Sequence, residues 1–424
     1  MADIPKIIRV EEFLKERYEF RYNIISNDVE YRMIGGFNDG EKDLEYQFEV
    51  CNEEALKYEL MCDSFRGFDK ELNALMKYKF MKPYDPFSIY FEELGEYDPA
   101  TEPDYITELL SYVEIVYQDE NKAAEERAYF ELMFKKHLVR QIACALTMIP
   151  FNKQCFVFYS TQNDGKTSFI RNLCPPSLKE YITENINFAE PKDSKIALST
   201  NFMINLDEMA SLSKQDINVC KSFMTLDSIK LRRPYDKKET TAPRRATFWG
   251  TTNNQEYLSD ETGSVRWITF EVKSINHDYG GKNGYSSVNI DNVWKQAYHL
   301  LKTGFKFQMD NQELKDSEER NKLHQKTTTE MELIKEFFVP SEKGGFDEVL
   351  RITAEFMPTY KVRQRLDYYT NSKLDLKDFQ IGKALRFLGF KQDTYRMPDS
   401  IYPLKGYWII DTQKSIRTSE IPKI

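Results

Sequence analysis

The sequence has few of the side chains from which metal centres and disulfide scaffolds are built. Its 424 residues include six cysteines and four histidines, all scattered along the chain, and no two cysteines form a CxxC pair. This pattern is typical of reduced, mostly buried thiols. It argues against a zinc site, a disulfide framework and catalysis by a histidine-based triad.

Long apolar runs are also missing. No run approaches the ~20 residues that span a bilayer, and the first twenty residues carry charges where a signal peptide has an apolar core. We therefore expect a cytoplasmic protein with no membrane partner. The net charge of −9 gives no general attraction to nucleic acid, so any contact with DNA must come from a local basic patch.

Strands and helices are expected to alternate in the middle of the chain. The expected strands are residues 155–159, 202–206, 246–253 and 266–272, and the expected helices are residues 165–173 and 214–226. Such alternation predicts an α/β domain with a mostly parallel sheet. One long helix is expected before it, at residues 121–150.

The length predicts two or three domains. We place an N-terminal accessory domain, mixed α/β or helical, at residues 1–120 and the α/β domain at 121–308. A charged helical connector follows at 309–340. In the last part, 341–424, a helix at 375–388 followed by a strand at 407–410 suits a small winged-helix-like domain.

A candidate phosphate-binding loop joins the first expected strand to the helix that follows it. Gly165 allows close approach of the backbone to a phosphate, Lys166 supplies a charge, and Thr167 supplies a hydroxyl for Mg²⁺. Ser160 stands where the usual pattern has glycine. The candidate ATP-binding residues are Ser160, Thr161, Gln162, Asn163, Asp164, Gly165, Lys166, Thr167 and Ser168.

Four further polar residues lie at or next to the ends of expected strands. Asp207 and Glu208 end the strand at 202–206, where Asp207 can hold Mg²⁺ and Glu208 can activate a water. Asn253 can position the same water, and Arg266 can act as an arginine finger toward a neighbouring subunit. Taken singly, Asp207 and Glu208 fit an acidic turn better than a catalytic site, and Asn253 fits an Asn-rich turn better. Arg266 fits a surface arginine as well as a finger.

A basic stretch lies between these positions. Residues 230–245 contain seven Lys and Arg against two acids, inside an acidic protein. The alternative to a DNA contact is a solvated, charged hairpin.

In this order the motifs resemble a ring-forming helicase ATPase. Residues 150–305 resemble the virulence-associated protein E family, relatives of the phage and viral superfamily III helicases. The segments that carry the resemblance are QNDGKTSFIRNL (162–173), DSKIALSTNFMINLDEMASLSK (193–214), KSFMTLDSIKLRRPYDKKETTAPRRATFWGTTN (221–253) and YLSDETGSVRW (257–267).

The resemblance implies an AAA+-like P-loop NTPase core that assembles as a ring, which we expect to be hexameric, with ATP and Mg²⁺ bound between subunits. It implies catalytic roles for Lys166, Asp207, Glu208, Asn253 and Arg266, Mg²⁺ ligation by Thr167 and Asp207, and DNA contacts from a pore hairpin that carries Arg232, Arg233, Lys237 and Lys238. Two departures are notable. Many family members have glycines at the positions of Ser160 and Asn163, and a second arginine at the position of Val265.

These observations predict an ATP-dependent DNA helicase or translocase that acts in replication of a phage or mobile element. Its expected partners are single-stranded or forked DNA, further copies of the chain, and a separate primase or initiator protein. Two alternatives stay open: a nucleotide-switched signalling or defence ATPase, and a non-enzymatic DNA-binding replication adaptor with a decayed nucleotide site.

Overall fold

The structure is a computed structural model that describes residues 4–34, 47–77, 81–161, 164–184, 186–188, 191–231, 239–258, 264–277, 284–371, 373–398 and 400–414. The chain divides into two compact units. The first consists of Met1–Gln255 and Ser264–Asn321, and the second of Glu256–Gly263 and Lys322–Ile424. The expected connector at 309–340 is thus shared between the two units, while the expected division into three domains joined by this connector stays a prediction.

The first unit begins with a small α/β layer. Its elements are α1 (Lys6–Arg17), β1 (Tyr18–Asn23), β2 (Val29–Met33), β3 (Glu49–Val50), α2 (Glu53–Cys62), α3 (Asp69–Lys77) and β4 (Lys82–Tyr84). The sheet order is β3-β2-β1-β4, and β4 runs parallel to β1. Val10, Phe13 and Leu14 lie one turn apart on α1, and this apolar stripe packs into the core of the layer.

A six-stranded sheet forms the centre of the first unit. Its strands are β5 (Val113–Ile115), β6 (Cys155–Tyr159), β7 (Ile182–Thr183), β8 (Met203–Leu206), β11 (Thr247–Thr252) and β12 (Trp267–Ile275). The order is β5-β12-β6-β11-β8-β7, and every neighbouring pair is parallel except β5 with β12. The four strands expected from the sequence are confirmed as β6, β8, β11 and β12. All residues of β6, β8 and β11 are buried, as the apolar runs of a parallel sheet require.

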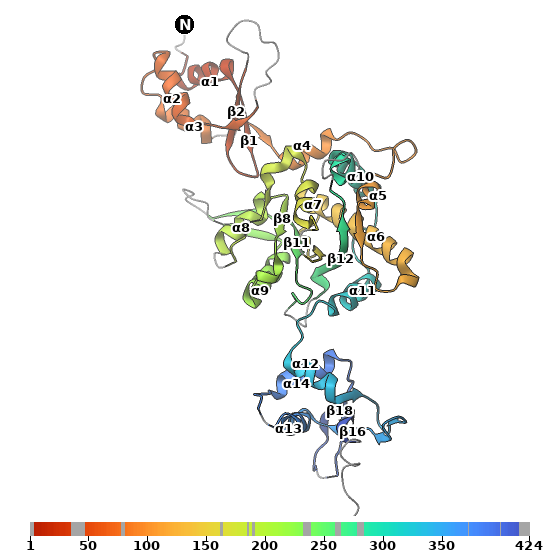
Figure 1. Ribbon diagram of the computed structural model, residues 1–424. Coiled ribbons are helices and arrows are strands. Elements are labelled where there is room, and N and C mark those ends of the chain that lie inside the picture. Colours follow the sequence, from red (N-terminus) through yellow and green to blue (C-terminus); the bar gives the residue numbers. More distant parts are fainter. Residues whose placement is uncertain are drawn as a thin grey trace, which may run out of the picture. The chain divides into compact units, whose positions relative to one another are not determined.

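Helices cover this sheet (Figure 1). They are α4 (Pro86–Glu93), α5 (Tyr105–Ser111), α6 (Ala123–Ala145), α7 (Lys166–Leu173), α8 (Pro191–Thr200), α9 (Lys214–Met224), α10 (Ile290–Lys302) and α11 (Asn311–Lys322). The helices expected at 165–173 and 214–226 are confirmed as α7 and α9. In the described part of the chain, no helix has both the length and the apolar character needed to cross a membrane.

The long helix expected at 121–150 is confirmed as α6, which ends five residues early, at Ala145. Its second half is buried and carries charged side chains that have partners. The Lys136 ammonium lies 2.6 Å from the Glu313 carboxylate, and Arg140 donates to the carbonyl of Phe307 at 2.7 Å. These contacts attach the start of α11, and the segment that precedes it, to α6.

A two-stranded hairpin leaves the sheet domain between α9 and β11. Strands β9 (Ser228–Leu231) and β10 (Thr240–Pro243) pair antiparallel, with Leu231 opposite Thr240. The structure therefore contains the base of the hairpin expected for the basic stretch. Its tip lies outside the described residues.

In its described residues, the second unit forms three helices, a four-stranded sheet and a separate two-stranded sheet of β14 and β15. Its elements are α12 (Thr329–Phe337), β13 (Phe338–Pro340), β14 (Phe346–Asp347), β15 (Ile352–Thr353), β16 (Glu355–Met357), α13 (Thr359–Tyr369), α14 (Asp378–Phe387), β17 (Gln392–Tyr395) and β18 (Leu404–Asp411). Strand β18 pairs with β13, β16 and β17. The helix expected at 375–388 and the strand expected at 407–410 are confirmed as α14 and β18.

Candidate functional site

Three neighbouring strands end at one pocket of the first unit. Strands β6, β11 and β8 are adjacent and parallel, so their carboxyl ends meet at the same edge of the sheet. The pocket has a volume of about 260 Å³ and is lined by Asp164, Gly165, Lys166, Thr167, Ser168, Asp207, Glu208, Thr251 and Asn253. The fold thus brings together residues that are up to 89 positions apart in the sequence.

The loop after β6 turns into α7 at Gly165. This glycine has φ of +75°, a left-handed conformation that side chains other than glycine rarely adopt, and α7 begins at the next residue. Ser160 is not among the described non-glycine residues with positive φ. The serine that replaces the usual glycine therefore causes no backbone strain there. Gln162 and Asn163 lie outside the described residues.

Lys166 is folded back onto its own loop. Its ammonium donates to Ser160 Oγ at 2.6 Å, to the Ser160 carbonyl at 3.3 Å and to the Thr161 carbonyl at 3.0 Å. Only 6% of the residue is exposed. Burial lowers the pKa of the Lys166 ammonium, and the carboxylates of Asp164 and Asp207 act against this shift.

The Asp207 carboxylate is held by two hydroxyls. Its Oδ1 atom accepts hydrogen bonds from Thr167 Oγ1 at 2.8 Å and from Thr251 Oγ1 at 2.5 Å. The Thr251 hydroxyl also accepts the Glu208 backbone N–H at 3.2 Å, and Glu208 has φ of +51°. One side chain on β11 thus fixes both acidic residues that follow β8.

Thr251 was not among the site residues expected from the sequence. The polar end of its strand, Thr251-Thr252-Asn253-Asn254, was a usable signal, but Asn253 alone was singled out. Asn253 does line the pocket, with an exposed side chain.

An ion pair, also not expected from the sequence, lies at the same edge of the sheet. Arg171 on α7 binds Glu184 through two hydrogen bonds of 2.8 and 2.5 Å, and Asn205 of β8 donates to the same carboxylate at 3.0 Å. These donors, Arg171 first, lower the pKa of the Glu184 carboxyl. Through Glu184, these contacts connect α7 to β8, the strand that precedes Asp207.

Arg266 is not part of this pocket. It ends a short 3-10 turn, Ser264–Arg266, directly before β12, and Trp267 pairs with Cys155, the first residue of β6. Arg266 therefore lies near the amino end of β6, whereas the loop that follows Tyr159 lies at the carboxyl end of that strand. Its Nε atom is buried and has no hydrogen-bond partner among the described residues.

The basic stretch contains two arginines that are structural. Arg244 is 1% exposed and donates to the carbonyls of Phe223, Met224 and Ala246. Arg245 donates to the Asp85 carboxylate at 2.7 Å and to the Ala145 carbonyl at 2.9 Å. Both arginines fix the base of the β9–β10 hairpin. The expected DNA-binding residues Arg232, Arg233, Lys237 and Lys238 lie outside the described residues.

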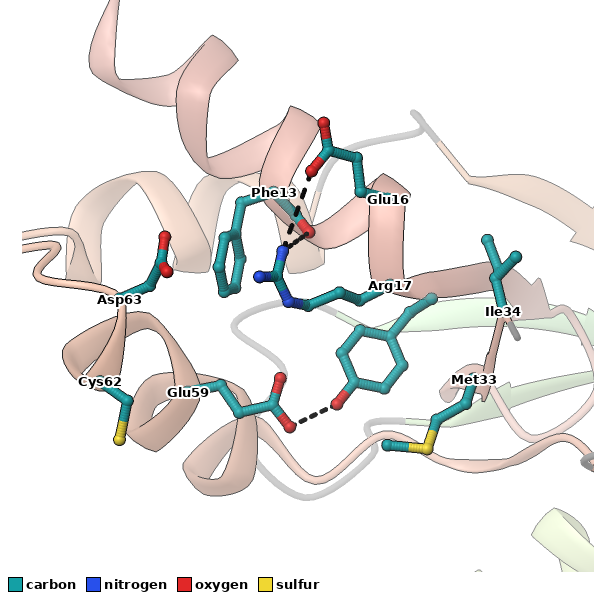
Figure 2. Close-up of a pocket in the computed structure, with 9 residues that line it drawn as sticks. Phe13, Glu16, Arg17, Met33, Ile34, Glu59, Cys62 and Asp63 are labelled. Atoms are coloured by element: carbon teal, nitrogen blue, oxygen red, sulfur yellow. Dashed lines mark hydrogen bonds and ion pairs between the residues drawn. The ribbon is translucent and has the colours of Figure 1, made fainter. Parts of the chain in front are cut away.

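A larger pocket, about 580 Å³, lies in the N-terminal layer between α1, α2 and the start of β1 (Figure 2). The Arg17 guanidinium stacks 3.7 Å from the centre of the Phe13 ring, and the Tyr18 hydroxyl donates to Glu59 at 2.5 Å. Three carboxylates line it, those of Glu16, Glu59 and Asp63. Since these outnumber the one arginine, this pocket disfavours an anionic ligand such as a nucleotide.

The family model described as the virulence-associated protein E-like domain matches residues 112–326. A comparison with curated proteins gave no match. Among solved structures, the chain is similar to "The apo structure of NrS-1 C terminal region (305-718)", with 12% identity, a TM-score of 0.47, and coverage of 96% of this chain and 100% of that one. It is also similar to "SCCmec type IV Cch - active helicase", with 12% identity, a TM-score of 0.34, and coverage of 94% and 93%.

Proposed function

Because this chain belongs to the virulence-associated protein E-like domain family, we propose that it is an ATP- and Mg²⁺-dependent ATPase of the helicase type that acts on DNA. The biological setting we propose is the replication of a phage or other mobile element. The observation that carries the proposal is the pocket at the ends of β6, β8 and β11, which gathers a lysine, three hydroxyls, three carboxylates and an amide. These are the groups that ATP hydrolysis requires.

The phosphate-binding part of the proposal rests on the loop before α7. The N-terminus of a helix offers backbone N–H groups and a positive dipole end to a phosphate. We assign to Lys166 the role of binding the β- and γ-phosphates. To do so its ammonium exchanges its hydrogen bonds with Ser160 and Thr161 for bonds with phosphate oxygens.

The donor set suits a magnesium ion. The Thr167 hydroxyl and the Asp207 carboxylate lie 2.8 Å apart, and oxygen ligands of this kind are those that Mg²⁺ prefers. We propose that these two residues hold Mg²⁺, directly or through water. The ion would neutralise charge on the phosphates, while the chain orients them.

We propose that Glu208 and Asn253 act on the water that attacks the γ-phosphate. Glu208 would accept its proton, and the Asn253 amide would hold it in line with the γ-phosphate. The backbone of Glu208 is fixed by its bond to Thr251, which supports a defined direction for the carboxylate.

Arg266 is assigned to a neighbouring subunit's site. Its place at the edge of the sheet opposite the pocket favours action between subunits over action within one chain. This assignment requires assembly, and we propose an AAA+-like core that forms a ring, with six subunits as the expected number.

We propose that the β9–β10 hairpin contacts single-stranded DNA through Arg232, Arg233, Lys237 and Lys238. Basic side chains at a hairpin tip can follow the phosphates of a strand. The buried arginines Arg244 and Arg245 support the proposal indirectly, since Arg244 anchors the hairpin's base to α9, and Arg245 anchors it to α6 and to Asp85 before α4. For the second unit we propose a winged-helix-like fold, supported by the order α12, β16, α13, α14, β17, β18.

Single-stranded DNA should stimulate ATP hydrolysis by the parent protein and not by a Lys237→Ala, Lys238→Ala variant. Hydrolysis without DNA serves as the control, and it should be equal in the two proteins. Equal stimulation would favour a signalling or defence ATPase. An absence of hydrolysis in every condition would favour the DNA-binding adaptor.

A further inference from the structure

The N-terminal layer carries more than half of the net negative charge of the chain. Residues 1–84 contain eighteen Asp and Glu against thirteen Lys and Arg, a difference of −5, in a chain whose net charge is −9. The pocket of about 580 Å³ lies in this layer, between α1, α2 and the start of β1. The charge of the layer favours a cationic ligand there.

Two carboxylates of α2 line this pocket from successive turns. Glu59 and Asp63 are four residues apart, so they lie one above the other on the same side of the helix. Among the described residues, the ion pairs of the layer use other carboxylates, namely those of Glu11, Glu16, Glu19, Glu30 and Glu54. The α2 side of the pocket is therefore left with uncompensated negative charge.

The partner of Glu59 inside the pocket is neutral. The Tyr18 hydroxyl donates to Glu59 Oε1 at 2.5 Å, and Tyr18 itself is buried. Burial and this hydrogen bond raise the pKa of the Tyr18 hydroxyl, so it stays protonated. The bond fixes the direction of the Glu59 carboxylate and leaves its charge in place.

The one arginine of the pocket is engaged by α1 (Figure 2). The Arg17 guanidinium donates to the Phe13 carbonyl at 3.3 Å and lies 3.9 Å from the Glu16 carboxylate. It also covers one face of the Phe13 ring. Arg17 thus compensates charge on α1, whereas the carboxylates of α2 are available to a cation from outside.

Apolar side chains are exposed on both sides of the pocket. Met33 ends β2, Ile34 follows it, and these two pocket-lining residues are 48% and 51% accessible. On α2, Tyr58 is 67% accessible and lies one turn before Cys62, which also lines the pocket. Exposed apolar side chains that gather around a hollow are typical of a surface for another protein.

We propose that this pocket binds a basic amphipathic helix of a partner protein. A helix that lies along α2 presents lysine or arginine at positions i and i+4, the spacing of Glu59 and Asp63, so each carboxylate meets one cation. The apolar side of the helix covers Met33 and Ile34. A nucleic acid is disfavoured because its phosphates would meet the carboxylates, and a free polyamine would leave the apolar side chains exposed.

Fluorescence anisotropy with the full chain tests this pocket. The probe is a fluorescein-labelled peptide of about 14 residues in which leucine and lysine follow helical spacing. One control peptide has glutamate in place of each lysine, and another has serine in place of each leucine. We expect the chain to bind the probe and neither control. No binding of the probe below about 1 mM overturns the proposal.

The first variant, Glu59→Gln with Asp63→Asn, removes the charge on α2 and keeps an oxygen that accepts the Tyr18 hydroxyl. It should bind the probe about three- to tenfold more weakly at low salt, and the difference should shrink as salt is added. The matched control is Glu12→Gln with Glu53→Gln, which removes two exposed carboxylates of the same layer that do not line the pocket. This control should bind like the parent.

A second variant, Met33→Ser with Ile34→Ser, changes exposed positions and keeps the charge. It should weaken binding of the probe several-fold and leave the salt dependence as in the parent. Lys166→Ala should bind the probe like the parent, because the two pockets share no lining residue. A failure of the proposed ATPase function is therefore distinguishable from a failure of this pocket.

Parental affinity for the probe in both pocket variants overturns the proposal, as does an equal loss of binding in the Glu12→Gln, Glu53→Gln control. Two further results would assign the pocket to another occupant and overturn it as well. Binding of spermidine as tight as that of the probe would indicate a free polyamine. A smaller assembly of the Glu59→Gln, Asp63→Asn variant in sedimentation velocity would indicate a second copy of the chain.

Discussion

Thr251 joins the two acidic residues of the pocket, since its hydroxyl lies 2.5 Å from Asp207 Oδ1 and accepts the Glu208 backbone N–H at 3.2 Å. The threonine comes from β11, whereas the acids follow β8, so the contact crosses between adjacent strands. A group placed in this way can set the position of both carboxylates without touching the substrate.

Thr251→Ala should lower kcat for ATP hydrolysis by about 10- to 100-fold, because a hydrogen bond to a charged group contributes about 1.5–3 kcal/mol. KM should change little, since the lysine and the loop stay intact. Thr251→Ser keeps the hydroxyl and should retain most of the activity. Steady-state hydrolysis assays on the three proteins test this role, and an Ala variant with parental kcat would exclude it.

Ser160→Ala should increase the affinity for ATP by a few-fold. The Ser160 hydroxyl accepts the Lys166 ammonium at 2.6 Å, and phosphate oxygens must compete with this bond. When the hydroxyl is absent, Lys166 loses one hydrogen bond fewer on binding phosphate, so the free-energy cost of binding is lower. Titration with a fluorescent ATP analogue measures the change, and Ser160→Thr, which keeps the hydroxyl, is the control. Weaker binding by Ser160→Ala would mean that the serine itself contacts the nucleotide.

The pocket was largely predictable from the sequence, because apolar strands that end in polar residues meet at one edge of a parallel sheet. Asp207 and Asn253 were expected from this pattern and Lys166 from the Gly165-Lys166-Thr167 loop, and all three line the pocket. Their catalytic roles stay predictions. Thr251 begins the polar end of its strand, but it was missed because the sequence does not show which of these side chains faces the acids that follow the neighbouring strand. The buried role of Arg244 and Arg245 was also not predictable, since a count of charges does not distinguish an arginine that binds carbonyls from one that faces solvent.

Arg266→Ala and Lys166→Ala should each be inactive alone but regain activity when mixed. Arg266 lies at the sheet edge opposite its own pocket, so a mixed assembly contains interfaces where an intact lysine meets an intact arginine. Loss of an arginine finger lowers the rate by about 10³- to 10⁵-fold. Hydrolysis by the mixture, compared with the sum of the two variants alone, is the measurement. No recovery in a mixture that has exchanged subunits would contradict action between subunits.

Asp85→Asn should destabilise the first unit by about 3 kcal/mol, because it leaves the buried Arg245 guanidinium without its charged partner. Asparagine still caps α4, where Asp85 accepts the N–H groups of Phe87 and Ser88. The change therefore isolates the ion pair. Urea unfolding, monitored by tryptophan fluorescence, measures the loss in free energy of unfolding. The double variant Asp85→Asn, Arg245→Met should recover part of this loss. An unchanged unfolding midpoint for Asp85→Asn would show that the pair does not hold the hairpin base.

ATP hydrolysis at the pocket can be measured as Mg²⁺-dependent release of phosphate from ATP by the purified chain and by Lys166→Ala. We expect turnover by the parent that is lost on chelation of Mg²⁺ and lost in the variant, with both proteins equally folded by circular dichroism. Equal turnover in the two proteins, or none in the parent with and without DNA, would contradict ATP hydrolysis at the pocket.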